Sequence, residues 1–202
     1  MPSLRRKWQT WRHARRFAVR GRRNRFPFPD LYLDGHVELG DMCRFRNNVV
    51  LRTFGTGKII MGSRSGFSWN CVAEARERIV VGARTGIAEN VVVRDFVIDL
   101  WNHPGDWRAA PCIVKPIHIG SDVFVGSYSY IGPGVTIGDS AVIAQHSLVL
   151  DDVGPGEIWD GRPARRIGHR TENVPERVRL QVAELLATRG VQLDRNEGQY
   201  RM

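Results

Sequence analysis

Aliphatic residues recur every six positions across the middle of the chain. The clearest run contains six hexads, at Ile119, Val125, Ile131, Ile137, Ile143 and Val149. A small or β-branched residue follows four places after each of them, at positions 123, 129, 135, 141, 147 and 153. A period of six fits neither a 3.6-residue helix nor a hairpin meander, but it fits short strands that turn the same way around a prism. The pattern predicts a parallel β-helix with these side chains inside.

The same phase continues towards the N-terminus with interruptions. The earlier hexad positions are Leu33, Leu39, Phe45, Leu51, Met61, Phe67, Ala73, Val81, Ile87 and Val93. Gly55 takes the small-residue place after Leu51, four extra residues precede Met61, and two more precede Val81. The pattern then fails until Ile119, and roughly six or seven coils are expected over residues 33–153. A loop that leaves a rigid scaffold often carries function; the alternative is a tolerated surface insertion.

Charge is concentrated at the start of the chain. The 202 residues carry a net charge of +9, yet residues 1–29 hold ten Lys or Arg and no acid. The other 173 residues therefore have 20 basic against 21 acidic residues, a net charge of −1. The length fits one domain with appendages. Because the body is near neutral, the charge is poor evidence for a nucleic-acid-binding domain, and we expect no nucleic-acid partner.

Three segments are expected: a basic, helical extension over residues 1–29, a β-helix over 30–168, and a C-terminal helix and tail over 169–202. In the extension, Leu4, Trp8 and Trp11 would form an apolar stripe among arginines. Residues 1–25 could then bind an anionic membrane peripherally, or the tryptophans could pack on the β-helix or a neighbouring subunit. No apolar run suits a signal peptide or a membrane span. We expect a cytoplasmic protein, with the inner face of the membrane as its site of attachment.

Three cysteines lack metal-ligand spacing. Cys43 and Cys71 occupy the small-residue place of a hexad, and Cys112 lies in the break. The first two are therefore predicted to be reduced side chains of the core, which agrees with a cytoplasmic location.

From Pro116 to Gly168 the sequence resembles the hexapeptide-repeat acyltransferases, which include galactoside, maltose, serine and xenobiotic acetyltransferases. The matching phrases are Val123-Phe124-Val125-Gly126, Pro133-Gly134-Val135-Thr136-Ile137-Gly138 and Gly161-Arg162-Pro163-Ala164-Arg165. The resemblance implies a left-handed β-helix, a homotrimer with active sites between subunits, acetyl-CoA as acyl donor and no metal. The sequence departs from the family where Phe124 replaces a Trp and where Asp151-Asp152 replaces a Lys.

The break in the hexads contains His103-Pro104, which matches the family's catalytic His and the Pro that often follows it. A base must take the proton of an attacking hydroxyl, whereas the thioester is already activated, so one His is enough. His103 is the only one of six His residues on the break. The sequence therefore predicts His103 as the general base.

Further site residues follow from the resemblance. Asn70 matches an acceptor-binding position, and Asp99, Trp101 and Asn102 share the His103 loop, where they would orient the imidazole or bound the acceptor pocket. The expected coenzyme A residues are Gly126, Ser127, Gln145, Arg165 and Arg166. The backbone N–H of Ser127 would receive the thioester carbonyl, and the arginines would bind phosphates.

The predicted function is acetyl transfer from acetyl-CoA to a sugar hydroxyl of a surface polysaccharide, glycolipid or small glycoside. One alternative is N-acetylation of an amino sugar or nucleotide-linked sugar, and another is a non-catalytic β-helix used for assembly. A third is a γ-class carbonic anhydrase. His103, His118 and His146 are spaced 15 and 28 residues apart and lack that class's closely spaced ligand pair.

Overall fold

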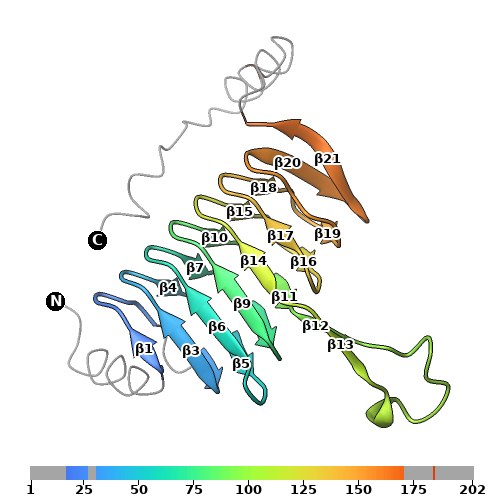
Figure 1. The fold of residues 1–202 in the computed structure, drawn as a ribbon. Helices are drawn as coiled ribbons and strands as arrows, with labels where there is room; N and C mark the ends of the chain where they lie inside the picture. The colour runs from blue at the N-terminus through green and yellow to red at the C-terminus, as the bar shows by residue number, and fades with distance from the viewer. Residues whose placement is uncertain (1–16, 27–30, 171–183, 185–202) are drawn as a thin grey trace. The chain divides into compact units, whose positions relative to one another are not determined.

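The computed structural model describes residues 17–26, 31–170 and 184. Three sheets, parallel except for β21, form the sides of a left-handed β-helix, whose stacked coils are seen in Figure 1. Sheet A contains β1 (Val19–Arg20), β3 (His36–Leu39), β6 (Lys58–Met61), β9 (Arg78–Val81), β14 (Ile117–Ile119) and β17 (Thr136–Ile137). Sheet B contains β4 (Arg44–Phe45), β7 (Gly66–Phe67), β10 (Gly86–Ile87), β15 (Phe124–Val125), β18 (Val142–Ile143), β20 (Glu157–Gly161) and β21 (Ala164–His169). Sheet C contains β2 (Leu31–Asp34), β5 (Val49–Thr53), β8 (Val72–Ala75), β11 (Val92–Arg94), β16 (Tyr130–Ile131) and β19 (Leu148–Val149).

The hexad positions line the inside of the prism. All the aliphatic and aromatic hexad residues predicted from the sequence are buried, including Leu33, Ile87 and Ile143. Most small positions are buried as well, but Gly55 is exposed because it lies in the turn between β5 and β6 with a φ of +58°. A Cβ at Gly126 would lie 2.5 Å from the backbone nitrogen of Gln145, so successive coils approach too closely there for a side chain.

The interruptions of the hexad pattern all fall at one corner, where the chain passes from sheet C to sheet A. The turn of residues 54–57 joins β5 to β6, and residues 76–77 join β8 to β9. The longest interruption lies between β11 and β14 and contains a hairpin of β12 (Phe96–Ile98) and β13 (Cys112–Val114). Extra residues are therefore accommodated at a single edge, the C–A edge, and the coils on both sides keep their register.

The β-helix begins earlier than the predicted boundary at residue 30. β1 pairs in parallel with β3, and Arg25 bridges to Arg44. Inside this first coil, Phe17, Phe26 and Phe45 stack at centroid distances of 5.0 and 5.7 Å. Residues 17–26 are thus part of the β-helix and not of a helical extension, because their aromatic side chains cover its open end. The expected basic helix otherwise falls on residues 1–16, outside the described part of the chain.

The other end of the prism is closed by an antiparallel hairpin. β20 pairs with β18 and folds back onto β21, which places Trp159 in the core. The expected C-terminal helix falls largely on residues 171–202, of which only Glu184 is described. Within the described residues, no helix has the length and apolar character needed to cross a membrane.

The two cysteines predicted for the core are buried, free thiols. Burial raises the pKa of Cys43 and of Cys71 to about 11. Both thiols therefore stay protonated and unreactive at neutral pH. Cys112 on β13 is also a free thiol and is only partly buried.

Candidate active site

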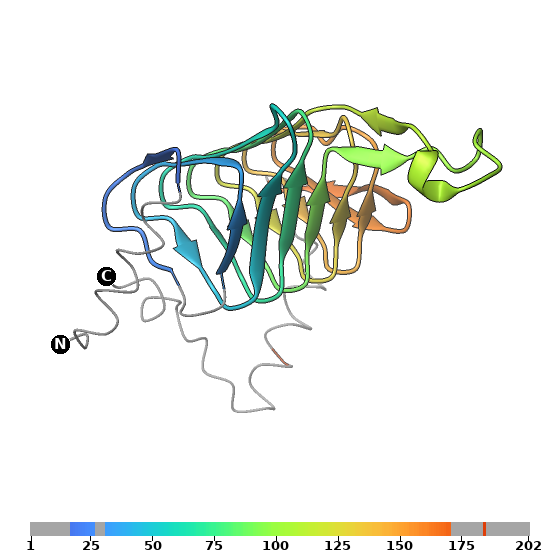
Figure 2. The same ribbon diagram turned by 90° about the horizontal axis from the view of Figure 1, so that it is seen from below.

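The predicted general base lies on a hairpin that projects from the C–A edge (Figure 2). Asp95 anchors the base of this hairpin. Its fully buried carboxylate accepts hydrogen bonds from the backbone N–H groups of Arg76, Glu77 and Arg78, each at 2.8 Å. Its carbonyl accepts the N–H of Lys115, where the chain returns, at 2.9 Å. One residue therefore ties both strands of the hairpin to the preceding coil.

Aromatic and cationic side chains pack around the same base. Phe96 meets Phe54 edge-on at a centroid distance of 5.8 Å. The guanidinium of Arg76 lies over both rings, 4.7 Å from the centroid of Phe96 and 5.1 Å from that of Phe54. Such cation–π contacts restrict how the first strand of the hairpin can pivot.

A short turn orders the tip that carries His103. The carboxylate of Asp99 accepts the backbone N–H of Asn102 at 3.2 Å and its side-chain amide at 2.9 Å. The pKa of Asp99 lies below its usual range, mainly because of the hydrogen bond from the Asn102 side chain. The backbone hydrogen bonds and the charge of His103 lower this pKa further. Asp99 is thus ionised, and its hydrogen bonds go to Asn102, while His103 in the same loop is partly buried.

The hairpin exposes apolar side chains on its outer surface. Trp101 is 96% exposed, and the cross-strand pair Val97 and Ile113 are 46% and 45% exposed. Leu100 and Trp107 are also largely exposed. So much apolar area on a projecting element is typical of a surface that another chain covers.

The expected acceptor and coenzyme residues lie on a different edge, where sheet B passes to sheet C. Along this B–C edge, Ser127 and Gln145 occupy turns of successive coils, and Asn70 lies in a turn two coils before Ser127. The side-chain oxygen of Asn70 accepts an amide N–H of Asn48 at 3.0 Å. The hydroxyl of Ser127 donates to Glu89 at 2.7 Å, which leaves its backbone N–H as the group that could meet a carbonyl oxygen. Gly126 precedes Ser127 at the close approach described above.

The two predicted arginines each face an acid. Arg165 pairs with Asp151 at 2.8 Å, and Arg166 pairs with Glu157 at 3.2 Å. Both pairs lie near the end of the prism, and the Arg165–Asp151 pair is exposed on both sides. The acidic residue that replaces the family's Lys is therefore a direct partner of one arginine expected to bind phosphate.

Within one chain, the predicted site residues fall into two groups that lie on different edges of the prism. His103, Asp99, Trp101 and Asn102 share the hairpin at the C–A edge, whereas Ser127 and its neighbours follow the B–C edge. The full width of sheet C separates the two edges.

Sequence reasoning missed Glu89, whose carboxylate accepts the hydroxyl hydrogens of both Ser68 and Ser127. Its partners are 21 and 38 residues away in sequence, so no local pattern indicates the contact. In the part of the chain that the structure describes, no three His, Cys, Asp or Glu residues are grouped so that they could hold a metal ion.

Known proteins share these repeats. The bacterial transferase hexapeptide family (six repeats) matches residues 116–151. In these repeats the chain is similar to hexapeptide-repeat acetyltransferases. It is 47% identical over 55 residues to a chloramphenicol acetyltransferase of Agrobacterium fabrum, covering 27% of this chain and 26% of the relative. It is 48% identical over 52 residues to the galactoside O-acetyltransferase of Escherichia coli, covering 26% of each.

These matches span only about a quarter of the length of each relative. A solved structure is similar in fold over a much larger part of the chain. AntD, an N-acyltransferase from Bacillus cereus in complex with dTDP and 3-hydroxybutyryl-CoA, superposes with a TM-score of 0.70. The alignment covers 90% of this chain and 96% of AntD at 18% identity, which supports the fold and carries no residue roles.

Proposed function

We propose that the protein is an acetyl-CoA-dependent O-acetyltransferase that acts on a sugar hydroxyl of a surface polysaccharide, glycolipid or small glycoside. The observation that carries this proposal is the single hairpin that interrupts the repeats and presents His103 at an ordered tip. Among the described coils, the longest interruption of the repeats carries a partly buried imidazole and an ionised carboxylate in one loop. This arrangement suits a base that acts on a substrate outside the prism.

In the proposed reaction, His103 takes the proton of the acceptor hydroxyl as its oxygen attacks the thioester carbonyl carbon. The negative charge that develops on the carbonyl oxygen is received by the backbone N–H of Ser127. The carbon–sulfur bond then breaks, and the proton passes from His103 to the coenzyme A sulfur. Acetyl ester and free thiol are the products. No metal takes part in this scheme.

The coenzyme would lie along the B–C edge. Ser127 and Gln145 occupy successive coils on this edge, so an extended pantetheine arm could run parallel to the prism axis and hydrogen-bond to backbone groups. Arg165 and Arg166 lie at the end of the prism, where phosphates would follow. The guanidinium of Arg165 has five N–H donors, and only its Nη1 group contacts Asp151 and the carbonyl of Ala164, so its other donors could meet a phosphate. AntD and the relatives named above make an acyl-CoA donor consistent with the repeats.

A complete site would require a second copy of the chain, because His103 and Ser127 lie on different edges of one prism. We infer a homotrimer in which the hairpin of one chain faces the B–C edge of the next. Threefold packing would also cover the exposed apolar residues of the hairpin, among them Trp101 and the pair Val97 and Ile113.

The test is to incubate the protein with acetyl-CoA and p-nitrophenyl glycosides of common hexoses and amino sugars, and to follow release of the coenzyme thiol. We expect acetylated glycosides by mass spectrometry, with the acetyl group removed by mild alkali because it is an ester. Transfer confined to amino sugars, giving an alkali-stable amide, would replace the O-acetyltransferase with the N-acetyltransferase alternative. No transfer to any glycoside would contradict the proposal.

A further inference from the structure

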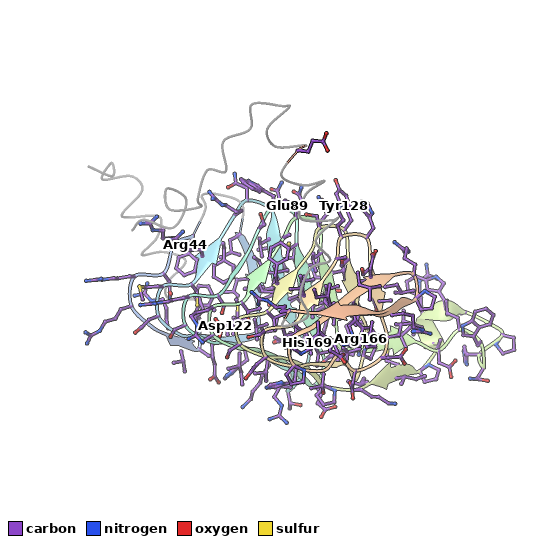
Figure 3. All side chains as sticks on the ribbon, turned by 90° about the horizontal axis from the view of Figure 1, so that it is seen from above. Arg44, Glu89, Asp122, Tyr128, Arg166 and His169 are labelled. Atoms are coloured by element: carbon purple, nitrogen blue, oxygen red, sulfur yellow. The ribbon has the colours of Figure 1, made fainter. Side chains whose placement is uncertain are left out.

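Glu89 occupies a position on the B–C edge that the scheme above does not use. It follows β10, and both of its carboxylate oxygens are engaged from neighbouring coils. Ser68, one coil before, donates to Oε1 at 2.8 Å, and Ser127, one coil after, donates to Oε2 at 2.7 Å. The backbone carbonyl of Glu89 also accepts the N–H of Tyr128 at 2.9 Å, and the two residues lie close together in Figure 3.

This carboxylate is held ionised. Hydrogen bonds from Ser127 and then from its own backbone N–H and Ser68 keep its pKa below the usual range for Glu, and Arg46 adds a smaller electrostatic contribution. The guanidinium of Arg46 lies over the ring of Trp69, 4.8 Å from its centroid. A carboxylate has about four acceptor sites, and the two serine hydroxyls and the residue's own N–H take three of them, which leaves one for another donor. Glu89 is therefore a fixed anion with hydrogen-bonding capacity to spare.

The outer face of sheet B beside Glu89 leaves room for a ligand. Gly86, three residues earlier, points outward, and a Cβ added there would meet only the Cδ2 atom of Phe124, at 3.7 Å. Gly66, its neighbour in register on β7, differs, because a Cβ there would lie within 2.4 Å of the carbonyl oxygen of Arg44. Packing within the chain therefore explains Gly66 but not Gly86. A glycine in a sheet without such a packing reason can mark a surface that a ligand approaches closely.

Phe124 supplies an apolar wall at the same place. Its ring is 51% exposed and lies in register with Gly86 on the next coil. An exposed aromatic ring, a bare backbone and a fixed carboxylate are together suited to a sugar ring, whose carbon–hydrogen face can stack while its hydroxyls donate hydrogen bonds.

We propose that Glu89 is a specificity-determining residue that contacts the acceptor and restricts it to neutral or cationic sugars. The proposal rests on the proposed function, because it places the acceptor beside Ser127, where the thioester carbonyl would be received. A hydroxyl or ammonium group of an acceptor would donate to the remaining acceptor site of Glu89. An acceptor that carries its own carboxylate would be repelled by the fixed charge.

The test compares acetyl transfer to a p-nitrophenyl glucoside with transfer to the corresponding glucuronide, in which a carboxylate replaces the C6 hydroxymethyl group. Only transfer to the ring hydroxyls that both sugars share is counted. We expect the wild type to favour the neutral glucoside in kcat/KM by at least tenfold. Glu89→Gln, which keeps one oxygen for a serine hydroxyl and removes the charge, should reduce this preference at least fivefold. The change should appear mainly in the KM of the acceptor, while the Kd of acetyl-CoA, measured by calorimetry, stays within twofold.

Asp122→Asn is the matched control. Asp122 is a carboxylate on the edge between sheets A and B, paired with Arg84 at 2.6 Å, so its substitution makes the same change in net charge elsewhere. The glucoside preference should be unaffected in this variant. If Glu89 served only to hold the coils together, Glu89→Gln would lower the melting temperature and the rate for both glycosides equally, and an unchanged preference would overturn the inference. A wild type inactive on both glycosides would contradict the proposed function as well.

Discussion

Removal of the Asp95 carboxylate should destabilise the protein and displace the His103 hairpin. The side chain is fully buried and accepts three backbone N–H groups at 2.8 Å. Hydrogen bonds to a charged acceptor each contribute roughly 1.5–3 kcal/mol. Residues 76–78 are themselves exposed, so water can replace part of the loss in Asp95→Ala. We therefore expect a decrease in unfolding free energy of about 3–5 kcal/mol.

Asp95→Asn should lie between the wild type and the alanine variant. One oxygen of the amide can still accept from Glu77 and Arg78, but the amide nitrogen then faces the N–H of Arg76 as a second donor. The expected loss is about 2 kcal/mol. The assay is urea unfolding of each variant, with thermal melting as a second measure; a chain of this length loses roughly 2–4 °C per kcal/mol.

Asp139→Ala provides the comparison. Its exposed carboxylate also caps a turn, but it accepts only the N–H of Ser121, at 2.7 Å. Its loss should be about 1 kcal/mol or less. If Asp95→Ala were no less stable than Asp139→Ala, Asp95 would not be the anchor of the hairpin. A stable Asp95→Ala variant with full activity would likewise refute the reasoning.

Three further predictions concern assembly and accessibility. The double variant Val97→Asp, Ile113→Asp should be monomeric in light scattering, because both exposed side chains of this cross-strand pair would contact another chain in the homotrimer. A persistent trimer would contradict the inferred assembly. Deletion of residues 1–16, which spares the buried Phe17, should preserve the fold but abolish salt-sensitive binding to anionic vesicles. Each basic residue near the membrane surface contributes roughly 1 kcal/mol to such binding. Loss of the trimer in this variant would show a structural role instead. A thiol reagent at pH 8 should modify Cys112 quickly and the two core cysteines only after unfolding, because burial keeps the core thiols protonated; three fast-reacting thiols would contradict this.

The hexads allowed most of the prism to be predicted from the sequence. A period of six follows directly from the geometry of a coil, so each aliphatic hexad residue could be assigned to the interior, and Ile119, Val125 and Ile131 lie there. The break could be located for the same reason, because a coil cannot lose its phase without leaving the prism. The hairpin that leaves the prism at that point is anchored by Asp95. Its structure depends on contacts with an earlier coil, and the hexad period does not encode those contacts.

The ends of the β-helix were harder to predict. β1 is only two residues long and lies among arginines, and the first coil is closed by stacked Phe17 and Phe26 instead of aliphatic hexads. At the other end, the β20–β21 hairpin replaces the last coil with antiparallel pairing. Capping elements cover an open core and therefore do not repeat the pattern of that core.

The assignment of His103 as general base is tested most directly by steady-state kinetics of His103→Ala with acetyl-CoA and an accepted glycoside. Turnover should fall at least about a hundredfold, the lower range for loss of a general base. The Kd of acetyl-CoA should stay within about twofold, because the imidazole acts on the acceptor hydroxyl. Near-normal turnover in this variant would contradict the central claim that the hairpin carries the catalytic base.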